Sequence, residues 1–211
     1  MKPYNSYSYI YPPRPEYKIL PDSLDKYDTG EYIAQAKFNG SCCELFMDGV
    51  SKTMIKNRHN GTLTLFKLSE EEMKSVYRGK GHMVLVGEYM NKNQNDENEK
   101  SWNHKFVIFD ILVYNSEYLV GTTYTERYNL LKEIYETKPY SDYADQITDN
   151  IFMVKNYENN FKTIWERITK IGMLEGLVLK KREGKLERGT REKNNMGWQC
   201  KARKPNPNYT F

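Results

Sequence analysis

A lysine stands at the end of an apolar stretch, in the tetrapeptide Lys37-Phe38-Asn39-Gly40. The residues before it, 33–37, and those after it, 41–47, both have the pattern of a β-strand. The glycine between them lets the backbone approach a ligand closely, and a partly buried lysine amine can act as a nucleophile. Because short Lys-x-Asn-Gly strings also occur in ordinary turns, the chemical interpretation depends on the rest of the chain.

Three carboxylates interrupt apolar segments further along the chain. They are Glu88, Asp110 and Glu175, in LVGEYM, FVIFDILV and GMLEGLVLKK. An unpaired carboxylate is costly to bury, so each of them alone would indicate a loop or a polar partner in the core. Together with a lysine at a strand end they indicate a polar cleft between sheets, where carboxylates can bind Mg²⁺ and ribose hydroxyls.

Basic residues suited to holding phosphates lie in other segments, at Arg58, Lys180, Lys201 and Arg203. Lys201 and Arg203 are two residues apart in a predicted strand, so both side chains should point to the same face. Like charges on one face of a strand repel each other unless an anion lies beside them. A solvated basic edge is the alternative interpretation, although the neighbouring Trp198 favours partial burial.

The elements that must position these residues are mostly short strands. Asp48-Gly49 between two strand patterns is typical of a hairpin turn. Further strands are predicted at 83–90, 105–114, 151–154, 177–181 and 198–202. Short strands with a few helices among them predict an α+β fold with antiparallel sheets.

Two helices and one long loop complete the prediction. Thr123-Tyr124-Thr125-Glu126 forms a capping box that begins a helix, and apolar spacing over 161–171 predicts another. Residues 91–104 are strongly polar, so we expect a mobile loop that takes no part in the core. Residues 1–30, rich in Tyr and Pro, are expected to form an extended arm packed on a domain of residues 31–211. Their tyrosines could stack on bases, but aromatic packing is the favoured interpretation.

Bulk properties restrict the class of protein. The 211 residues carry a formal charge of +4, which permits a nucleic-acid partner without requiring one. The mean hydropathy is −0.84, and the absence of any apolar run near 18 residues argues against a membrane span. The three cysteines show no paired Cys-x-x-Cys spacing, and the amino terminus has no apolar signal segment. These features predict an intracellular, cytoplasmic protein with reduced thiols.

Taken in order, five segments of the chain resemble motifs I, III, IIIa, IV and V of the covalent nucleotidyltransferases, the polynucleotide ligases and mRNA capping enzymes. The segments are 37–40, 87–89, 106–112, 175–180 and 198–203. Arg58-His59-Asn60-Gly61 is similar to the arginine-containing element that follows motif I. The resemblance covers residues 31–204 and is closest to ATP-dependent ligases, because Glu126-Arg127 follows motif IIIa as in their next helix. It implies a ligase-type nucleotidyltransferase fold (ATP-grasp-like), with antiparallel sheets and flanking helices around a nucleotide cleft.

The resemblance also implies a covalent mechanism. Lys37 would attack the α-phosphorus of ATP, expel pyrophosphate and form a lysyl-AMP, for which its amine must be neutral. Lys201 and Arg203 would neutralise the α-phosphate and the leaving pyrophosphate, as catalytic cations. In later steps a ligase transfers AMP to a 5′-phosphate and seals that end to a 3′-hydroxyl.

The remaining site residues receive roles by the same resemblance. Phe109 would stack on the adenine, Gln35 would read its edge, and Glu88 would contact the ribose. Arg58 and Lys180 would touch ribose or phosphate. Glu175, which also lies on the nucleotide, would position Mg²⁺ (or Mn²⁺), with Asp110 as a supporting metal-binding acid.

Some positions depart from the ligase pattern, and alternatives therefore stay open. Asn39 replaces the acid usual in DNA ligases, and Cys42 replaces a frequent Arg. The expected substrate is nicked or broken nucleic acid, with DNA slightly favoured over RNA. No oligonucleotide-binding domain is expected after residue 204, so a separate protein could supply one. The alternatives are a GTP-dependent mRNA capping guanylyltransferase and a non-catalytic nucleotide- or nucleic-acid-binding relative.

Overall fold

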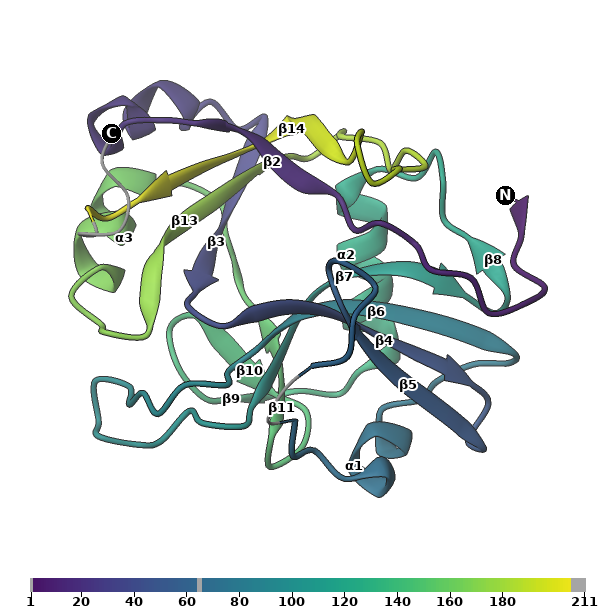
Figure 1. The fold of residues 1–211 in the computed structure, drawn as a ribbon. Coiled ribbons are helices and arrows are strands. Elements are labelled where there is room, and N and C mark those ends of the chain that lie inside the picture. Colours follow the sequence, from purple (N-terminus) through teal and green to yellow (C-terminus); the bar gives the residue numbers. More distant parts are fainter. Residues whose placement is uncertain (1, 64–65, 206–211) are drawn as a thin grey trace.

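The computed structural model describes residues 2–63 and 66–205, and its strands form two sheets (Figure 1). The larger sheet runs in the order β5 (Lys52–Asn57), β4 (Ser41–Asp48), β6 (His82–Tyr89), β7 (Phe106–Tyr114), β11 (Ile151–Val154), β10 (Ala144–Gln146) and β9 (Lys138–Pro139). At its side, β8 (Glu117–Tyr118) pairs with β7 and β1 (Lys2–Pro3) pairs with β8. The smaller sheet runs β12 (Asn156–Tyr157), β3 (Tyr32–Phe38), β13 (Leu174–Lys181), β14 (Asn195–Arg203) and β2 (Arg14–Lys18).

The prediction of an α+β fold is confirmed, but the sheets are not wholly antiparallel. β11 runs parallel to β7, and β14 runs parallel to β2. In the first case the chain crosses from β7 to β11 through α2 (Tyr124–Ile134), a connection long enough to return it in the same direction. In the second, the two strands come from opposite ends of the chain, and local sequence patterns carry no information about such a pairing.

The predicted hairpin and strands are present. β4 and β5 pair in antiparallel register from Cys43 opposite Asn57 to Asp48 opposite Lys52, and Gly49 in the connecting turn has φ +61°. A positive φ is easily adopted only by glycine, which explains why Asp-Gly marks this turn. The strands predicted at 177–181 and 198–202 begin earlier in the structure, at Leu174 and Asn195.

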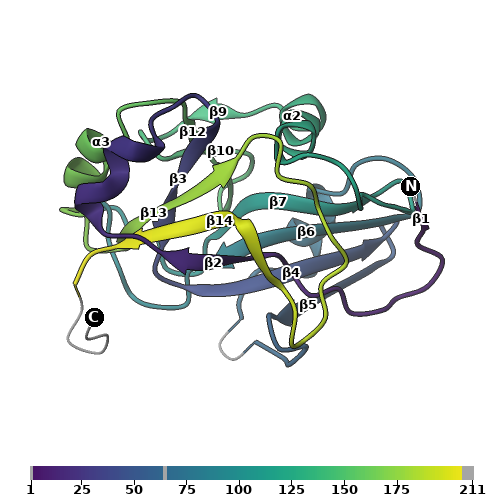
Figure 2. The ribbon, with the colours of Figure 1, turned by 90° about the horizontal axis from the view of Figure 1, so that it is seen from above.

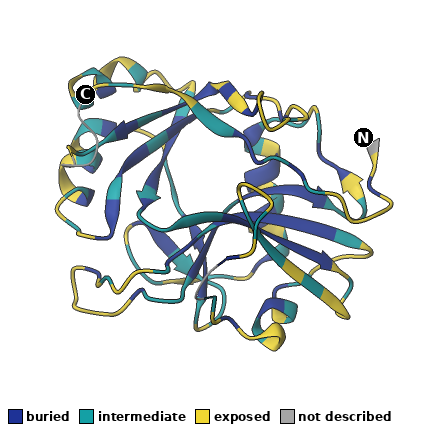
Figure 3. Ribbon diagram, in the orientation of Figure 1, coloured by how far each residue is buried: buried dark blue, intermediate teal, exposed yellow. Residues whose placement is uncertain are grey.

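Two hydrophobic clusters hold the sheets together, and Figure 3 shows the buried residues following the strands. One cluster lies on the larger sheet and includes Leu45, Leu85 and Ile111. The other joins the facing strands of both sheets, with Ala34, Ala36 and Phe38 from β3 and Phe152 and Val154 from β11. Alternate residues of β3 therefore point into this core, which leaves Gln35 and Lys37 on its opposite face.

α2 lies against β7 of the larger sheet and packs Tyr124 and Tyr128 beside Trp198 of the smaller one (Figure 2). α2 begins with the predicted capping box, in which Thr123 and Glu126 satisfy each other's backbone N–H groups. α3 (Phe161–Ile168) ends three residues before the predicted end, because residues 169–172 form turns. α3 buries Phe161, Ile164 and Ile168 beside the 3-10 helix η1 (Pro21–Tyr27). α1 (Glu70–Ser75) is a shorter helix capped by the Ser69 side chain, and no described helix is long and apolar enough to cross a membrane.

The loop of residues 91–104 was expected to lie outside the core, and that expectation is wrong. Trp102 is fully buried and packs against Phe38, Tyr143 and Phe152. Its indole N–H donates to the Asp96 carboxylate at 3.2 Å, so the loop also satisfies the one polar atom that Trp102 brings into the core. The prediction failed because it was based on the average polarity of the segment, which one buried aromatic residue hardly changes.

The first 30 residues contribute to both sheets. β1 extends the larger sheet through β8, and β2 forms an edge of the smaller one. Between them, Tyr4 is buried and Tyr7 and Tyr9 contact Phe46. These tyrosines pack on the body of the protein, whereas Tyr17 is exposed.

A buried ion pair connects the larger sheet to α2. Arg127 donates from Nε to Asp110 Oδ1 at 2.8 Å and from Nη2 to Oδ2 at 3.1 Å, and both side chains are at most 1% exposed. A third bond runs from Arg127 Nη1 to the Thr122 carbonyl oxygen at 2.8 Å. Each charge compensates the other, which accounts for a carboxylate in the middle of an apolar strand.

We predict that Arg127→Met destabilises the protein by about 3–5 kcal/mol, because it leaves the Asp110 charge buried without a partner. Urea unfolding measures this loss. Lys132→Met, which removes an exposed cation from the same helix, should cost less than about 1 kcal/mol and is the control. A loss below 1 kcal/mol for Arg127→Met would show that the pair does not stabilise the fold.

A second buried carboxylate has no such compensation. Glu44 in β4 is 0% exposed, and within the described residues neither of its oxygens has a hydrogen-bond partner. Burial raises the pKa of Glu44 to about 9, an effect only partly opposed by the Tyr9 hydroxyl. Glu44 is therefore a neutral acid in the folded protein at neutral pH, and an ordinary carboxylate near pKa 4.5 in the unfolded chain.

This difference makes stability depend on pH. A pKa raised by folding contributes stability that is present in full below about pH 4.5 and is lost as the pH rises to about 9. Glu44→Gln, which does not titrate, should therefore melt at a higher temperature than the wild type at pH 8.5, by an amount that shrinks towards pH 5. Calorimetry at several pH values tests this, with the exposed Glu133→Gln as control. A difference that does not change with pH would contradict the assignment.

Candidate active site

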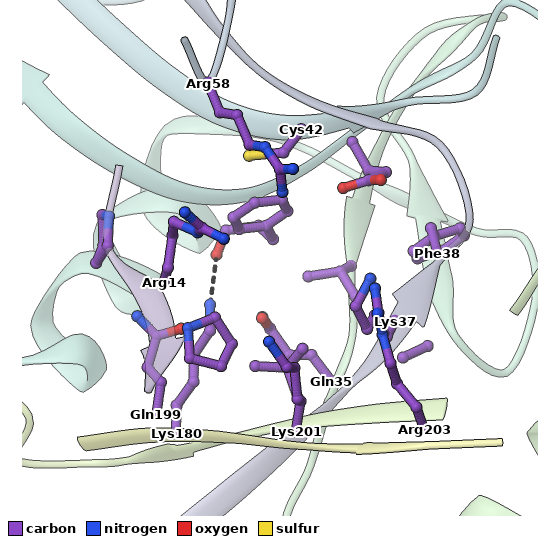
Figure 4. A pocket seen from close by; sticks show the side chains of 17 residues that line it. Arg14, Gln35, Lys37, Phe38, Cys42, Arg58, Lys180, Gln199, Lys201 and Arg203 are labelled. Carbon is purple, nitrogen blue, oxygen red and sulfur yellow. Dashed lines mark hydrogen bonds between the residues drawn. The ribbon is translucent and has the colours of Figure 1, made fainter. Parts of the chain in front are cut away.

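A pocket lies between the two sheets, with side chains converging on it from both (Figure 4). Of the ten site residues predicted from the sequence, the pocket wall contains eight: Gln35, Lys37, Arg58, Glu88, Phe109, Lys180, Lys201 and Arg203. Glu175 stands beside them in contact with Lys37 and Arg203. Asp110 is the exception, since it is sealed in its ion pair with Arg127.

In the smaller sheet, the register of the strands places the side chains that line the pocket. Lys201 on β14 lies opposite Val178 on β13, which in turn lies opposite Gln35 on β3. Arg203, Gly176 and Lys37 form a second row across the same three strands. Because side chains in register point to the same face of a sheet, both rows face the pocket.

A β-bulge brings Glu175 to the lysine. On β13, Leu174 pairs with Phe38 and Gly176 with Lys37, so Glu175 is the extra residue. Gly176 has φ +142°, and a Cβ there would collide with the Ala202 carbonyl oxygen. Glycine is therefore required for the bulge that turns Glu175 away from the core.

Glu175 forms the central ion pair of the pocket. Its Oε2 lies 2.6 Å from Lys37 Nζ and 2.8 Å from Arg203 Nη2. Burial opposes ionisation, but Lys37 and Arg203 together lower the pKa of Glu175 below its ordinary value. Because Lys37 Nζ is bound to this carboxylate, the lysine must leave the contact before it can act as a nucleophile.

A second bulge directs Phe109 into the pocket from the larger sheet. Val86 pairs with Asp110 and Gly87 with Ile108, so Phe109 has no direct partner on β6. Lys180 Nζ lies 5.1 Å from the centre of the Phe109 ring and 3.3 Å from its carbonyl oxygen. The aromatic ring and the cation therefore form one surface, suitable for stacking against a flat ligand.

Glu88 supports the turn that follows Lys37. Its Oε1 accepts a hydrogen bond from the Gly40 N–H at 3.0 Å. Burial raises the pKa of Glu88, while the Lys37 charge and this hydrogen bond act in the opposite direction. At Gly40 any Cβ would collide with the Tyr89 carbonyl oxygen, so the close approach of the two strands depends on this glycine.

A hydrogen-bond network determines the orientation of Gln35. Its Nε2 donates to the Tyr124 hydroxyl at 2.6 Å and to Asn156 Oδ1 at 2.9 Å. Tyr124 donates its own proton to Asn156 Oδ1 at 2.9 Å. Both amide hydrogens of Gln35 are thereby used, so its carbonyl oxygen is the group available to a ligand.

Positive charge accumulates in the pocket. Burial lowers the pKa of Lys180 to about 8 and that of Lys201 to about 8. For Lys201, the nearby charges of Arg203, Lys37 and Arg14 add to the effect of burial. Cations crowded in this way are stabilised by an anionic ligand such as a phosphate.

A metal at this site would need Glu175 rather than Asp110. Within the described residues no group of three or more His, Cys, Asp or Glu side chains could hold an ion. The prediction that Asp110 supports a metal is wrong, since both of its oxygens bind Arg127 and a third hydrogen bond comes from the Ile111 N–H. Mg²⁺ is often held by one or two carboxylates together with substrate phosphates, and Glu175 fits that pattern.

The sequence interpretation missed the contribution of the N-terminal segment. Pro13, Arg14 and Pro15 line the pocket, as does Gln199 on β14. The run Pro-Pro-Arg-Pro predicts an extended backbone, but nothing in it indicates which strand it joins. Arg14 could have been suspected only from being a lone cation in that run.

Comparison with known proteins agrees with this geometry. The family model for the ATP dependent DNA ligase domain matches residues 16–198. A search of curated proteins gives no match.

Solved ligase structures share the fold. A mycobacterial DNA ligase D complexed with ATP and MES superposes with a TM-score of 0.60 at 15% identity, over 92% of this chain and 60% of that one. The ligase domain of LigD from M. tuberculosis gives 0.62 at 15% identity, over 92% and 59%. A Lig E DNA ligase, described as binding DNA with a minimal scaffold, gives 0.55 at 16% identity, over 90% and 68%.

The chain thus spans about 60% of the length of the first two structures, and at such identity these likenesses show the fold alone. The family model, in contrast, covers most of the sequence, including every segment that lines the pocket between Gln35 and Lys180. The chain belongs to the ATP-dependent DNA ligase domain family.

Proposed function

We propose that this chain is the adenylation domain of an ATP-dependent ligase that seals DNA through a lysyl-AMP intermediate on Lys37. The observation that carries this proposal is the position of Lys37 Nζ, 2.6 Å from Glu175 in a pocket otherwise rich in cations. A module that only bound nucleotides would need the cations and the aromatic ring, but no lysine placed against a carboxylate at the end of a strand.

In the first step Lys37 Nζ attacks the α-phosphorus of ATP. A nitrogen–phosphorus bond forms, the bond to the β-phosphate oxygen breaks, and pyrophosphate leaves with the electron pair. The ammonium must first release one proton to solvent and give up its contact with Glu175 Oε2, and the nitrogen releases a second proton to solvent once its bond to phosphorus has formed. Arg203, 2.8 Å from the same oxygen, can keep that carboxylate paired while Lys37 moves to the phosphate. Lys201 stabilises the negative charge that develops on the phosphate oxygens.

The nucleobase is proposed to be adenine. With both amide hydrogens of Gln35 engaged by Tyr124 and Asn156, its oxygen presents an acceptor to the pocket. Adenine offers an exocyclic amine at the corresponding edge, whereas guanine offers a carbonyl oxygen there, and two acceptors repel. This arrangement favours ATP over the GTP that an mRNA guanylyltransferase would use.

A divalent cation is part of the proposal. Glu175 would hold Mg²⁺ (or Mn²⁺) together with phosphate oxygens, and its charge adds to burial in raising the pKa of the nearby Glu88. Such an ion supplies positive charge that offsets the phosphate charges. Drawing Glu175 away from Lys37 would also release the amine.

The later steps are proposed to act on nicked DNA, in which AMP passes to a 5′-phosphate and the 3′-hydroxyl then displaces it. The match to a family of DNA ligase domains supports DNA over RNA. A formal charge of +4 is compatible with binding the nucleic-acid backbone. A separate protein that supplies an oligonucleotide-binding module remains a prediction.

Incubation with Mg²⁺ and α-labelled ATP should label the wild-type protein covalently, and Lys37→Ala should abolish the label. Lys37→Arg is the matched variant, because it keeps a cation for Glu175 but offers no amine nucleophile, and it too should not be labelled. Lys52→Ala, an exposed lysine on β5, should label as the wild type does. Labelling by GTP instead of ATP would support a capping enzyme, and labelling of Lys37→Ala would contradict the assignment of the nucleophile.

ATP binding should also depend on pH. Lys180 and Lys201, each with a pKa of about 8, are charged below that pH and neutral above it. The affinity of Lys37→Ala protein for ATP should therefore fall as the pH rises from 7.5 to 9.5, by roughly five- to tenfold, since hydrogen bonds from charged donors are the stronger ones. Calorimetry measures the dissociation constant at each pH. Lys201→Gln, introduced in the same background, should show a smaller change, and an affinity that does not vary with pH would contradict the role of these lysines.

A further inference from the structure

Arg14 also lines the pocket, but none of the roles described above belongs to it. It lies on β2, where Arg14 is in register with Asn195 of β14 and its N–H donates to the Asn194 carbonyl oxygen at 2.8 Å. Pro13 and Pro15 on either side limit the backbone to extended conformations. The Asn194 side chain also donates to the Pro12 carbonyl oxygen at 3.3 Å. The backbone of Arg14 is therefore held in place, on the strand next to the one that carries Lys201 and Arg203.

The side chain of Arg14 points into the pocket. In Figure 4 it enters from the left and Arg58 from the top, whereas Lys37 and Arg203 lie on the right. Its charge is close enough to Lys201 to help burial lower the pKa of that lysine. Both sheets, including the N-terminal strand β2, thus bring cations into the same pocket.

Within the described residues, no carboxylate forms an ion pair with Arg14. In the described parts of the chain, Glu175 pairs with Lys37 and Arg203 only, and Arg14, Arg58 and Lys201 form no ion pair. Like charges that converge without a counter-ion destabilise the folded protein, so such an arrangement is most easily explained by an anionic ligand. The charge of Arg58 still acts on the Glu88 carboxylate, whereas the charges around Lys201, including that of Arg14, are all positive.

We propose that Arg14 binds a phosphate group of the substrate, so that the N-terminal segment completes the phosphate site of the pocket. This inference rests on the proposed function. Arg14 lies outside the five segments that resemble motifs of the covalent nucleotidyltransferases. A guanidinium presents several N–H donors in one plane and matches two phosphate oxygens at once. The phosphate has two possible sources: the β- and γ-phosphates of ATP, or the terminal 5′-phosphate of nicked DNA.

The test compares Arg14→Gln with Arg14→Lys, because Gln retains a polar side chain without the charge and Lys retains the charge. Lys26→Ala is the control, since it removes an exposed cation from the neighbouring helix η1. One arm measures the affinity for ATP and for adenosine in the Lys37→Ala background. The other measures the rate at which pre-adenylylated protein, freed of ATP, transfers AMP to nicked DNA.

If Arg14 holds the ATP phosphates, Arg14→Gln should weaken ATP binding by roughly 10- to 100-fold and leave adenosine binding unchanged. If it holds the 5′-phosphate, ATP binding should be unaltered and AMP transfer to DNA should slow by a similar factor. In either case Arg14→Lys should recover part of the loss, and Lys26→Ala should resemble the parent protein.

An equal loss of ATP and adenosine affinity would mean that Arg14 acts through the nucleoside or the fold, and would overturn the proposal. If ATP labels the protein on Lys37 but Arg14→Gln changes neither the affinity for ATP nor the rate of AMP transfer, the proposal is also overturned. A wild-type chain that binds no ATP would instead remove the proposed function, and this inference with it.

Discussion

The ion pair between Lys37 and Glu175 joins two neighbouring strands of the smaller sheet and depends on several features of the fold at once. It requires the bulge on β13, and the bulge requires Gly176 at a positive φ. It also requires Arg203 on β14, whose second contact keeps Glu175 ionised despite burial. The proposed nucleophile, its carboxylate and the cation proposed to bind phosphate are therefore assembled by the register of three strands, with no contribution from a flexible loop.

The ion pairs Asp110–Arg127 and Lys37–Glu175 serve different purposes because their exposure differs. Asp110 and Arg127 are at most 1% exposed and saturate each other, so their pair holds α2 to the larger sheet. Lys37 and Glu175 are 19% and 18% exposed; Lys37 lines a pocket that a ligand can enter, and Glu175 stands beside it. Such a pair can exchange partners during a reaction, whereas separating a fully buried one would leave charges in the core.

Each sheet has one of the two bulges that bring side chains to the site. In a regular strand alternate residues face the same side, so a reactive side chain next to a core residue must lie on the opposite face. The extra residue in each bulge removes this restriction, and it lets Phe109 and Glu175 face the pocket beside strands whose core residues stay buried. The N-terminal strand β2 closes the same pocket from the edge of the smaller sheet.

The sequence alone determined β3 to β7, β11, β13 and β14, the hairpin at Asp48-Gly49 and the capping box at Thr123, because these depend on local periodicity or on short motifs. Its resemblance to the covalent nucleotidyltransferases indicated eight residues of the pocket wall. It could not place β2 beside β14 or Trp102 in the core, since both depend on contacts between distant segments. It also misassigned Asp110: a carboxylate in an apolar strand looks the same whether its partner is a metal or an arginine 17 residues later. Only the tertiary structure decides between them, because the free energy of a buried charge is determined by what surrounds it in space.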